Sequence, residues 1–261
     1  VQKLMIQASQ IGLTSREDYS ALTLECLTEN LEESLKTLSR IMADPLFSGL
    51  RIDNIKEYMR HQARLEQDDS IIVGHLAALG AFFTGTGYGY STYGTEEAMK
   101  AIKKKDITSF YEAFFVPFNM TVVASSNLDS EKLAAILKKN LSSLPAGKAP
   151  EPLPIQVSSP AQKTIFIEKD KKQSYIALAF PLPNISRRNY TLAVLLENLL
   201  GRGQESKLWP LRSEERLAYN VNARSTLMQE AGLLEAYLET DVSKTEGALG
   251  SLKRIIKNLF E

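Results

Sequence analysis

The sequence predicts an α+β protein of two domains, on three observations. With 261 residues, 44% of them apolar and 24% charged, the chain can form one large or two ordinary globular cores. Strand-like and helix-like hydrophobic periods alternate along it. Five of its ten prolines fall between Pro145 and Pro160, where helix and sheet hydrogen bonding is interrupted. We therefore place a proline-rich linker at 145–162, between a first domain at 1–144 and a second at 163–261.

The elements of the first domain follow from its periodicity. Residues 19–27 alternate polar and apolar side chains, which predicts a half-buried strand. A helix should follow, because apolar residues recur at steps of three and four between a cap at Thr28 and the pre-proline Asp44. Further helices are predicted at about 53–67, 70–83, 95–102, 106–115 and 130–141, with a strand at 120–125.

The second domain mixes strands and helices in the same way. Its helices are predicted from Arg187, with Ser186 as cap and Gly201 as stop, and at about 205–214 and 244–260. Strands are predicted at 164–168, 174–180, 218–226 and 232–239. This mixture favours a layered α+β structure over an all-α or all-β one.

An internal repeat at an offset of 214 residues suggests that the two domains are homologous. The matched pairs are Leu24 with Leu238, Glu25 with Glu239, Leu35 with Leu249, Leu38 with Leu252, Arg40 with Arg254, and Ile41 with Ile255. A strand precedes a helix at both places. If the repeat is real, both copies are truncated: the first lacks the counterpart of 164–214, and the second stops before the counterpart of 47–141. The opening segment of the first copy would then lie upstream of Val1.

Charge and hydropathy exclude two classes of partner. Lysine plus arginine and aspartate plus glutamate number 31 each, so no net field attracts the chain to nucleic acid or to an anionic membrane. No apolar run approaches the roughly 18 residues that a membrane span needs. We expect no nucleic-acid binding and no membrane span.

Several segments resemble the insulinase/pitrilysin family of zinc metallopeptidases, which includes the mitochondrial processing peptidases. Residues 93–129, YGTEEAMKAIKKKDITSFYEAFFVPFNMTVVASSNLD, are similar to the late part of the family's amino-terminal domain, although Ser126-Asn127 replaces its usual Gly-Asp. LTSREDYSALTLECL and ADPLF upstream, and QSYIALAFPLP and LLENLLGRGQESKLWPLRSEERLAYNV downstream, extend the similarity over nearly the whole chain. The resemblance implies two homologous domains, each a mainly antiparallel sheet packed with helices.

The zinc site that the resemblance implies is not in this sequence. Active members bind zinc through an inverted His-x-x-Glu-His motif and a later glutamate. The two histidines, His61 and His75, are fourteen residues apart and lie outside any such motif, and we interpret them as ordinary helix residues. Aligning 57–70 with the family's helix puts Gln62 at the position of the third ligand, with Glu57 and Glu66 as alternatives after a slip of one turn. We expect no catalytic residue and no bound metal here, with zinc in an active partner.

Arg212 and Tyr219 are the candidate substrate-binding residues. The segment LRSEERLAY is similar to a family motif in which an arginine and a tyrosine, seven residues apart, face the zinc domain. The resemblance implies that both donate hydrogen bonds to substrate carbonyl oxygens and to the oxyanion. The alternative is structural: Arg212 pairs with Glu215, and Tyr219 packs at a strand edge.

Three functions remain open from the sequence. We favour a non-catalytic homologue that forms half of a peptide-binding chamber with a zinc-bearing subunit or domain of the same family and an extended peptide substrate. The first alternative is a piece of an active zinc metalloendopeptidase whose His-x-x-Glu-His helix lies upstream of Val1. The second is a structural core subunit without peptide binding, as in the respiratory cytochrome bc complex. Bacterial relatives favour the cell envelope or periplasm as location.

Overall fold

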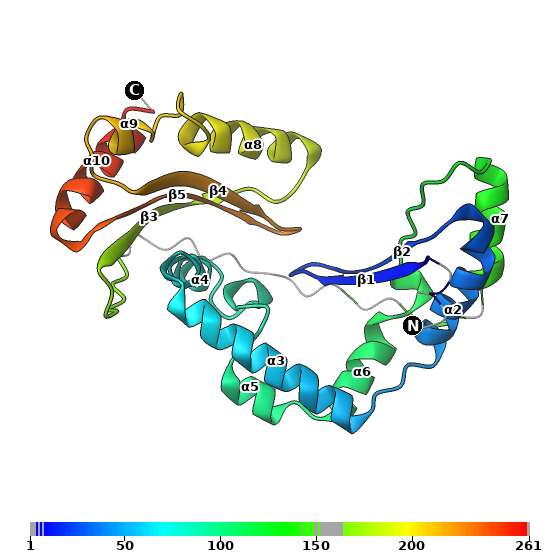
Figure 1. Cartoon of the computed structure of the whole chain (residues 1–261). Helices are drawn as coiled ribbons and strands as arrows, with labels where there is room; N and C mark the ends of the chain where they lie inside the picture. The colour runs from blue at the N-terminus through cyan, green and yellow to red at the C-terminus, as the bar shows by residue number, and fades with distance from the viewer. Residues whose placement is uncertain are drawn as a thin grey trace. The chain divides into compact units, whose positions relative to one another are not determined.

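The structure is a computed structural model, and it describes residues 4, 6, 8–142, 144–148, 151 and 164–259 (Figure 1). The chain divides into two compact units. Unit 1 combines Val1–His61 with Thr92–Pro154, and unit 2 combines Gln62–Ser91 with Ile155–Glu261. Most of the predicted linker at 145–162 lies outside the described residues. The division into sequence domains at 1–144 and 163–261 stays a prediction.

Unit 1 contains a two-stranded hairpin followed mainly by helices. Strands β1 (Gln10–Ser15) and β2 (Ser20–Glu25) pair antiparallel, and the Arg16 amide closes their turn by donating to the Tyr19 carbonyl at 2.8 Å. The remaining elements are η1 (Thr28–Asn30), α2 (Leu31–Ala43), the first part of α3 (Gly49–Asp68), α5 (Glu96–Ala101), α6 (Lys104–Phe114), η3 (Pro117–Asn119) and α7 (Ser130–Leu141). Helix α2 packs against α7 and buries Leu35 and Leu38.

The helix start predicted at Thr28 is displaced. Thr28 opens the short 3-10 turn η1, and its hydroxyl donates to the Asn127 side chain at 2.7 Å instead of capping α2. Asn30 precedes the first residue of α2 without a capping side-chain bond, and Asp44 ends the helix as predicted. The strand β1 was not predicted from the sequence, because its six residues, QIGLTS, carry a weak alternation interrupted by Gly12.

Unit 2 is built on a three-stranded antiparallel sheet in the order β3-β5-β4. Its strands are β3 (Gln173–Leu182), β4 (Asn220–Leu227) and β5 (Gly232–Asp241). The central residue Leu238 of β5 pairs with Ile176 on one side and Val221 on the other. The α+β class with antiparallel pairing is thus confirmed, whereas the homology and the truncation of two domains stay predictions.

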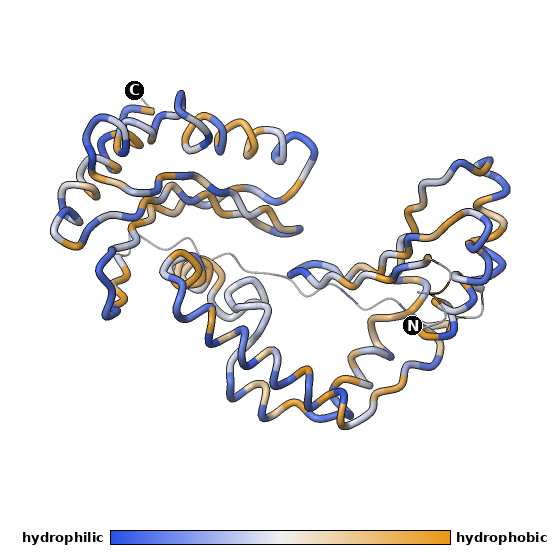
Figure 2. Tube along the Cα trace, in the orientation of Figure 1, coloured by the Kyte–Doolittle hydropathy of each residue, from blue (hydrophilic) through white to orange (hydrophobic). Residues whose placement is uncertain are grey.

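The two faces of this sheet differ in chemistry. One face is covered by α8 (Arg187–Gly201), α9 (Pro210–Ser213) and α10 (Thr245–Lys257), and Figure 1 shows α4 (Ser70–Phe82) on the opposite side. The first face holds one core cluster: Leu200, Leu208, Leu211, Val221, Ala223, Leu234, Ala236, Leu238, Ala248, Leu252 and Ile256. Helix α4 is apolar along most of its length (Figure 2), and its Leu79 and Phe82 belong to a second buried cluster with Leu233 of β5, on the face that also carries the charged Glu235.

Three predicted elements are wrong. Residues 120–125 and 164–168 form no strand, and their apolar side chains are exposed, Val123 at 90% and Phe166 at 91%. A strand needs a backbone partner, and neither segment has one among the described residues. The helix predicted at 205–214 is reduced to the single turn α9, because Pro210 lacks an amide donor and can only begin a helix.

No helix in the described part of the chain is long and apolar enough to cross a membrane.

Candidate functional site

Arg212 is presented at the surface on a fixed turn. It lies in α9, where Pro210 occupies an initial helical position and Leu211 is fully buried in the core. Arg212 itself is exposed, and its guanidinium carbon lies 5.3 Å from the centroid of the Trp209 ring. That distance suits a cation–π contact, which limits the directions that the long side chain takes. The turn therefore places the Arg212 guanidinium, a cationic hydrogen-bond donor, at the protein surface.

The loop after α9 is held at several points by backbone hydrogen bonds. The Leu217 amide donates to the Leu211 carbonyl at 2.8 Å, and the Glu215 amide donates to the Pro210 carbonyl at 2.9 Å. Arg216 adopts a left-handed conformation with φ of 53°, and its carbonyl accepts a bond from Lys244 Nζ at 3.0 Å. This loop is a defined connection from α9 to the sheet.

Tyr219 lies where that loop enters β4. Its amide donates to the Glu239 carbonyl of β5 at 2.9 Å, which fixes the backbone, while 57% of the residue is exposed. The phenol is therefore accessible at the end of the sheet. Arg212 and Tyr219 thus share two properties, an anchored backbone and an exposed side chain able to donate hydrogen bonds.

The structural alternative for Arg212 is not what the structure shows. Glu215, its expected partner, instead accepts from Arg254 Nη2 at 2.7 Å and from the Ser251 hydroxyl at 2.6 Å, both on α10. Among the described residues no carboxylate pairs with Arg212. Its guanidinium hydrogens are therefore available to a ligand.

Gln62 lies on α3 and is half-buried. Its assignment to the position of a third zinc ligand stays a prediction. Within the described residues, no group of three or more His, Cys, Asp or Glu side chains is placed to hold a metal ion. The expectation that this chain binds no metal stays a prediction.

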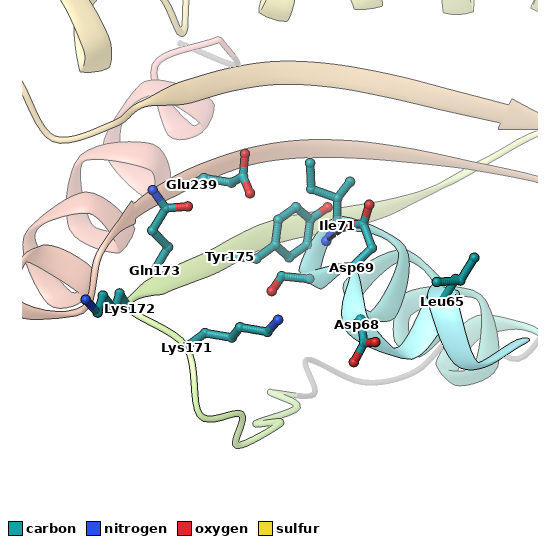
Figure 3. A pocket seen from close by; sticks show the side chains of 10 residues that line it. Leu65, Asp68, Asp69, Ile71, Lys171, Lys172, Gln173, Tyr175 and Glu239 are labelled. Carbon is teal, nitrogen blue, oxygen red and sulfur yellow. Dashed lines mark hydrogen bonds between the residues drawn. The ribbon is translucent and has the colours of Figure 1, made fainter. Parts of the chain in front are cut away.

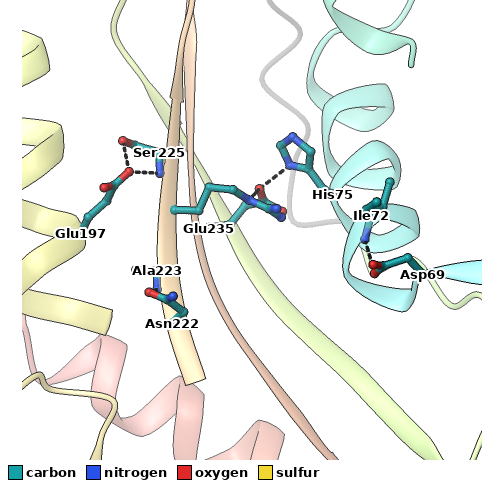
Figure 4. A network of polar contacts seen from close by, with 9 residues as sticks. Asp69, Ile72, His75, Glu197, Asn222, Ala223, Ser225 and Glu235 are labelled. Atoms are coloured by element: carbon teal, nitrogen blue, oxygen red, sulfur yellow. Dashed lines mark hydrogen bonds and ion pairs between the residues drawn. The ribbon is translucent and has the colours of Figure 1, made fainter. Parts of the chain in front are cut away.

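The two histidines have different surroundings. His61 is exposed on α3, and the nearby Glu57 pairs with Arg60 instead. His75 points from α4 to the sheet, where its Nδ1 lies 2.5 Å from Glu235 Oε2 (Figure 4). Glu235 is only 1% exposed. Its contact with His75 joins two segments of unit 2 that are 160 residues apart in the sequence.

Arg224 is a second partner of the same carboxylate. Arg224 Nε on β4 donates to Glu235 Oε2 at 3.0 Å, and its guanidinium lies 5.2 Å from the Tyr237 ring centroid. Burial raises the pKa of Glu235, but the hydrogen bond and charge of His75 and the charge of Arg224 offset this, and the net pKa lies below its ordinary value. Burial and the Glu235 charge both raise the pKa of Tyr175 on β3. Glu235 is thus a buried, ionised residue whose contacts with His75 and Arg224 link α4 to the sheet.

The sequence reasoning missed this cluster. The available signal was a single glutamate, Glu235, in the otherwise apolar strand sequence GLLEAYL, which requires a buried cation. The sequence offers many arginines and lysines, and nothing local identifies Arg224 or His75 as the partners. The register of β4 and β5 sets Arg224 opposite Glu235, and the packing of α4 on the sheet brings His75 to the same carboxylate.

A pocket of about 550 Å³ lies at the start of β3 and of α4 (Figure 3). Its lining carries both signs of charge and consists of Leu65, Asp68, Asp69, Ser70, Ile71, Lys171, Lys172, Gln173, Tyr175 and Glu239. Asp69 is already engaged, because it caps α4 by accepting from the Ile71 and Ile72 amides. Neither Arg212 nor Tyr219 lines this pocket.

Comparison with known proteins decides the family. Residues 101–261 match the family model described as the peptidase M16 inactive domain. The chain belongs to this family. The resemblance to insulinase-type zinc peptidases of a non-catalytic kind is thereby confirmed.

Relatives of this M16 chain include one protein named for lacking peptidase activity. The "non-peptidase homolog YmxG" of Helicobacter pylori is 25% identical over 250 residues, which cover 95% of this chain and 57% of that protein. Core protein I of the ubiquinol-cytochrome-c reductase complex of Euglena gracilis mitochondria is 26% identical over 82% of this chain and 42% of that protein. An "uncharacterized zinc protease YmxG" of Bacillus subtilis is 18% identical over 96% of this chain and 61% of that protein.

Solved structures share the M16 fold. The peptidase M16 inactive domain from Pseudomonas fluorescens superposes with a TM-score of 0.88 at 20% identity, covering 98% of this chain and 63% of that one. A chain in complex III2 of Candida albicans gives a TM-score of 0.75 at 19% identity, covering 90% and 58%. The M16 chain spans less than two thirds of each of these relatives.

Proposed function

We propose that this chain is the non-catalytic half of a peptide-binding chamber and that it presents Arg212 and Tyr219 to a peptide held against a zinc-bearing M16 partner. The observation that carries this proposal is the paired presentation of the two side chains. Each is exposed, and each projects from a backbone that core packing or sheet pairing fixes.

The chemistry of the two side chains suits a peptide. A guanidinium offers up to five N–H donors and a phenol one, and neither needs a change of protonation at neutral pH to donate. Peptide carbonyl oxygens are the most abundant acceptors on an extended substrate. A zinc ion on the partner would supply an activated water, and the Arg212 guanidinium would stabilise the negative charge that develops on the attacked carbonyl oxygen.

Reconstituted cleavage tests the proposal. The chain is mixed with a zinc-bearing M16 protein of the same organism, and kcat/KM is measured on an unstructured peptide. We expect cleavage only in the mixture, and a loss on the order of 10²–10³-fold for Arg212→Ala, the range found when an oxyanion donor is removed. Tyr219→Phe should lose a smaller factor.

Matched controls separate a substrate contact from general damage. Arg202 is another exposed arginine of unit 2, with 63% of its side chain accessible, and Arg202→Ala should leave turnover unchanged. Tyr190, 58% exposed on α8, matches Tyr219 in accessibility, so Tyr190→Phe serves the same purpose. Unchanged turnover in Arg212→Ala, with the complex intact by size-exclusion chromatography, would sink the proposal.

A structural subunit is the second candidate. It is favoured by the similarity to core protein I of Euglena gracilis and to a chain of the Candida albicans complex III2. This role predicts no affinity for extended peptides, either in the isolated chain or in its assembly. Isothermal titration calorimetry that detects micromolar binding of an extended peptide would exclude it.

A further inference from the structure

The turn around α9 sorts its side chains into two pairs. Leu208 and Leu211 are fully buried in the core, and the residues that follow them, Trp209 and Arg212, form the second pair. Residues three apart on a helical turn are neighbours on its surface. Trp209 has right-handed helical dihedral angles, and its carbonyl accepts a hydrogen bond from the Arg212 amide at 2.9 Å. The turn therefore places the indole and the guanidinium beside each other.

Trp209 is held in place through both its backbone and its ring. Its amide donates to the Ser206 carbonyl at 3.1 Å, and its carbonyl also accepts from the Ser213 amide at 3.0 Å. The indole is partly buried and packs against the core cluster that contains Leu208 and Leu211. Close packing of this kind leaves a side chain little freedom to move. The indole is therefore a fixed surface, over which the Arg212 guanidinium carbon lies at 5.3 Å from the ring centroid.

An aromatic partner orients Arg212 without using up its chemistry. A guanidinium has five N–H donors, and attraction of its charge to a ring face leaves most of these donors free for oxygen acceptors. A carboxylate partner would instead occupy donors and offset the positive charge. Glu215, three residues further along the chain, directs its carboxylate to Arg254 and Ser251. The contact with Trp209 thus restricts the arginine and keeps it able to donate.

We infer that Trp209 is a positioning residue, which holds the Arg212 guanidinium ready for the carbonyl oxygens of a bound peptide. The inference rests on the proposed function and concerns how the same site is prepared. A free arginine side chain has many rotamers, and ordering it when the substrate binds costs free energy. Contact with a fixed ring removes part of that cost beforehand, so more of the interaction with the transition state appears as rate. Trp209 acts through Arg212 and not on the substrate.

The effect depends on the aromatic face of residue 209 and not on its volume alone. Tryptophan offers the strongest cation–π surface, phenylalanine a weaker one, and leucine only apolar volume. Turnover should therefore fall from the natural chain to Trp209→Phe and further to Trp209→Leu. Trp209→Leu should lower kcat/KM by about two- to fivefold, the factor that one cation–π contact supplies at an exposed site.

A double-mutant cycle separates positioning from support of the fold. In the mixture with the zinc-bearing M16 protein, kcat/KM is measured for Trp209→Leu in the natural chain and in the Arg212→Ala background. If Trp209 acts through Arg212, its loss of about two- to fivefold disappears in the Arg212→Ala background. Damage to the turn, or a smaller folded fraction, would lower turnover equally in both backgrounds. Trp209→Phe, which retains a ring, should recover part of the loss.

Nuclear magnetic resonance of the chain alone gives a second readout. An aromatic ring shifts protons over its face upfield, so the side-chain protons of Arg212 should move downfield in Trp209→Leu and less in Trp209→Phe. Equal losses of turnover in both backgrounds, or Arg212 protons that do not move, would overturn the inference while the proposed function stands. If Arg212→Ala leaves turnover unchanged, the proposed function fails and the inference falls with it, even where the ring shift shows the contact.

Discussion

Two regions of the molecule follow one local plan, a hairpin, a 3-10 turn and a helix. In the first, β1 and β2 lead through η1 into α2, and in the second, β4 and β5 lead through η4 (Val242–Lys244) into α10. The bounds of η4 and α10 are those of η1 and α2 shifted by 214 residues. Both hairpin turns are closed by the same bond, Arg16 to Tyr19 and Met228 to Ala231, at 2.8 Å each.

The difference lies in the strand that follows each turn. The turns are separated by 212 residues rather than 214, so β5 runs two residues further before its 3-10 turn. Because side chains alternate across a strand, an ungapped match that is shifted by two residues still pairs residues of the same face. The repeat of 214 therefore fits the helices, and a shift of 212 fits the hairpins.

Strands β5 and β2 differ in burial because different elements lie beside them. β5 lies between β3 and β4 and is almost wholly buried, whereas β2 pairs with β1 alone in the described part of the chain, and its residues are exposed or only partly buried. Local sequence sets the plan of hairpin and helix. The elements packed around it decide whether it becomes a core.

The largest expected effect is a difference in stability loss between matched leucine substitutions in α10 and α2. Leu252 of α10 is fully buried, and its repeat counterpart Leu38 of α2 is 7% exposed at a smaller interface. Leu252→Ala should lower the free energy of unfolding by about 4 kcal/mol, and Leu38→Ala by about 2 kcal/mol, because cavity cost grows with packing. Urea titration followed by circular dichroism measures both; equal losses would contradict the distinction.

A matched pair of glycine substitutions contrasts the two hairpins. A Cβ at Gly201 would meet the Ala223 backbone of β4, whereas a Cβ at Gly12 of β1 would meet only the Thr23 hydroxyl, at 2.5 Å. Backbone cannot yield, but a side chain can rotate. Gly201→Ala should therefore destabilise by about 3 kcal/mol and Gly12→Ala by less than about 1 kcal/mol. Comparable midpoints of thermal unfolding for the two variants would show that α8 can shift away from β4.

The buried carboxylate of Glu235 should make the stability contributed by the second hairpin depend on pH, unlike that of the first. Glu235 on β5 corresponds at a shift of 212 to Thr23 on β2. Since the folded pKa of Glu235 is lowered, its stabilisation is present above the ordinary value of 4.5 and is lost as pH falls through the folded pKa. Glu235→Gln should cost about 2 kcal/mol at pH 7 and progressively less below pH 4.5.

Denaturant unfolding at several pH values checks this prediction. Glu25→Gln, at the exposed end of β2, is the control and should change stability by less than about 0.5 kcal/mol at any pH. A penalty for Glu235→Gln that does not depend on acid pH would mean that the carboxylate is not held ionised.

The smallest expected effect concerns β3, the strand that pairs with the second hairpin; the first hairpin has no such third strand among the described residues. The Tyr175 hydroxyl is buried without a hydrogen-bond partner there, so Tyr175→Phe should change stability by about 1 kcal/mol or less, in the stabilising direction. Because the pKa of Tyr175 is raised, the wild type should lose stability as pH rises above 10, and the variant should lose less. Identical alkaline unfolding curves would argue against the raised pKa.

Helices were the part of the fold best predicted from the sequence, because their signals are local. The limits of α7 and α8 were placed within a residue or two, since Ser130 and Ser186 lie at their starts and periodicity marks their buried faces. Strands depend on partners remote in sequence. The segments at 120–125 and 164–168 have suitable composition and no described partner, and the predictions failed there.

The candidate site divides in the same way. Arg212 and Tyr219 were recognised through a contiguous motif, and their exposure fits the interpretation without testing it. The His75–Glu235–Arg224 cluster unites three segments and was beyond local reasoning, although an ionisable residue in an apolar strand was a usable warning. Local sequence does not determine the register of β4 against β5, which sets Arg224 opposite Glu235.

Strand β3 is an outer strand of the described three-stranded sheet, and the residues at its two ends bear on solubility. An exposed strand edge invites identical molecules to stack edge to edge, which is the first step of aggregation. Here Lys171 and Lys172 precede the strand, and Pro181 interrupts its donors near the other end. Charge repels a second copy at one end, and the proline stops hydrogen bonding at the other. The two ends of β3 therefore disfavour the stacking of identical copies along this strand.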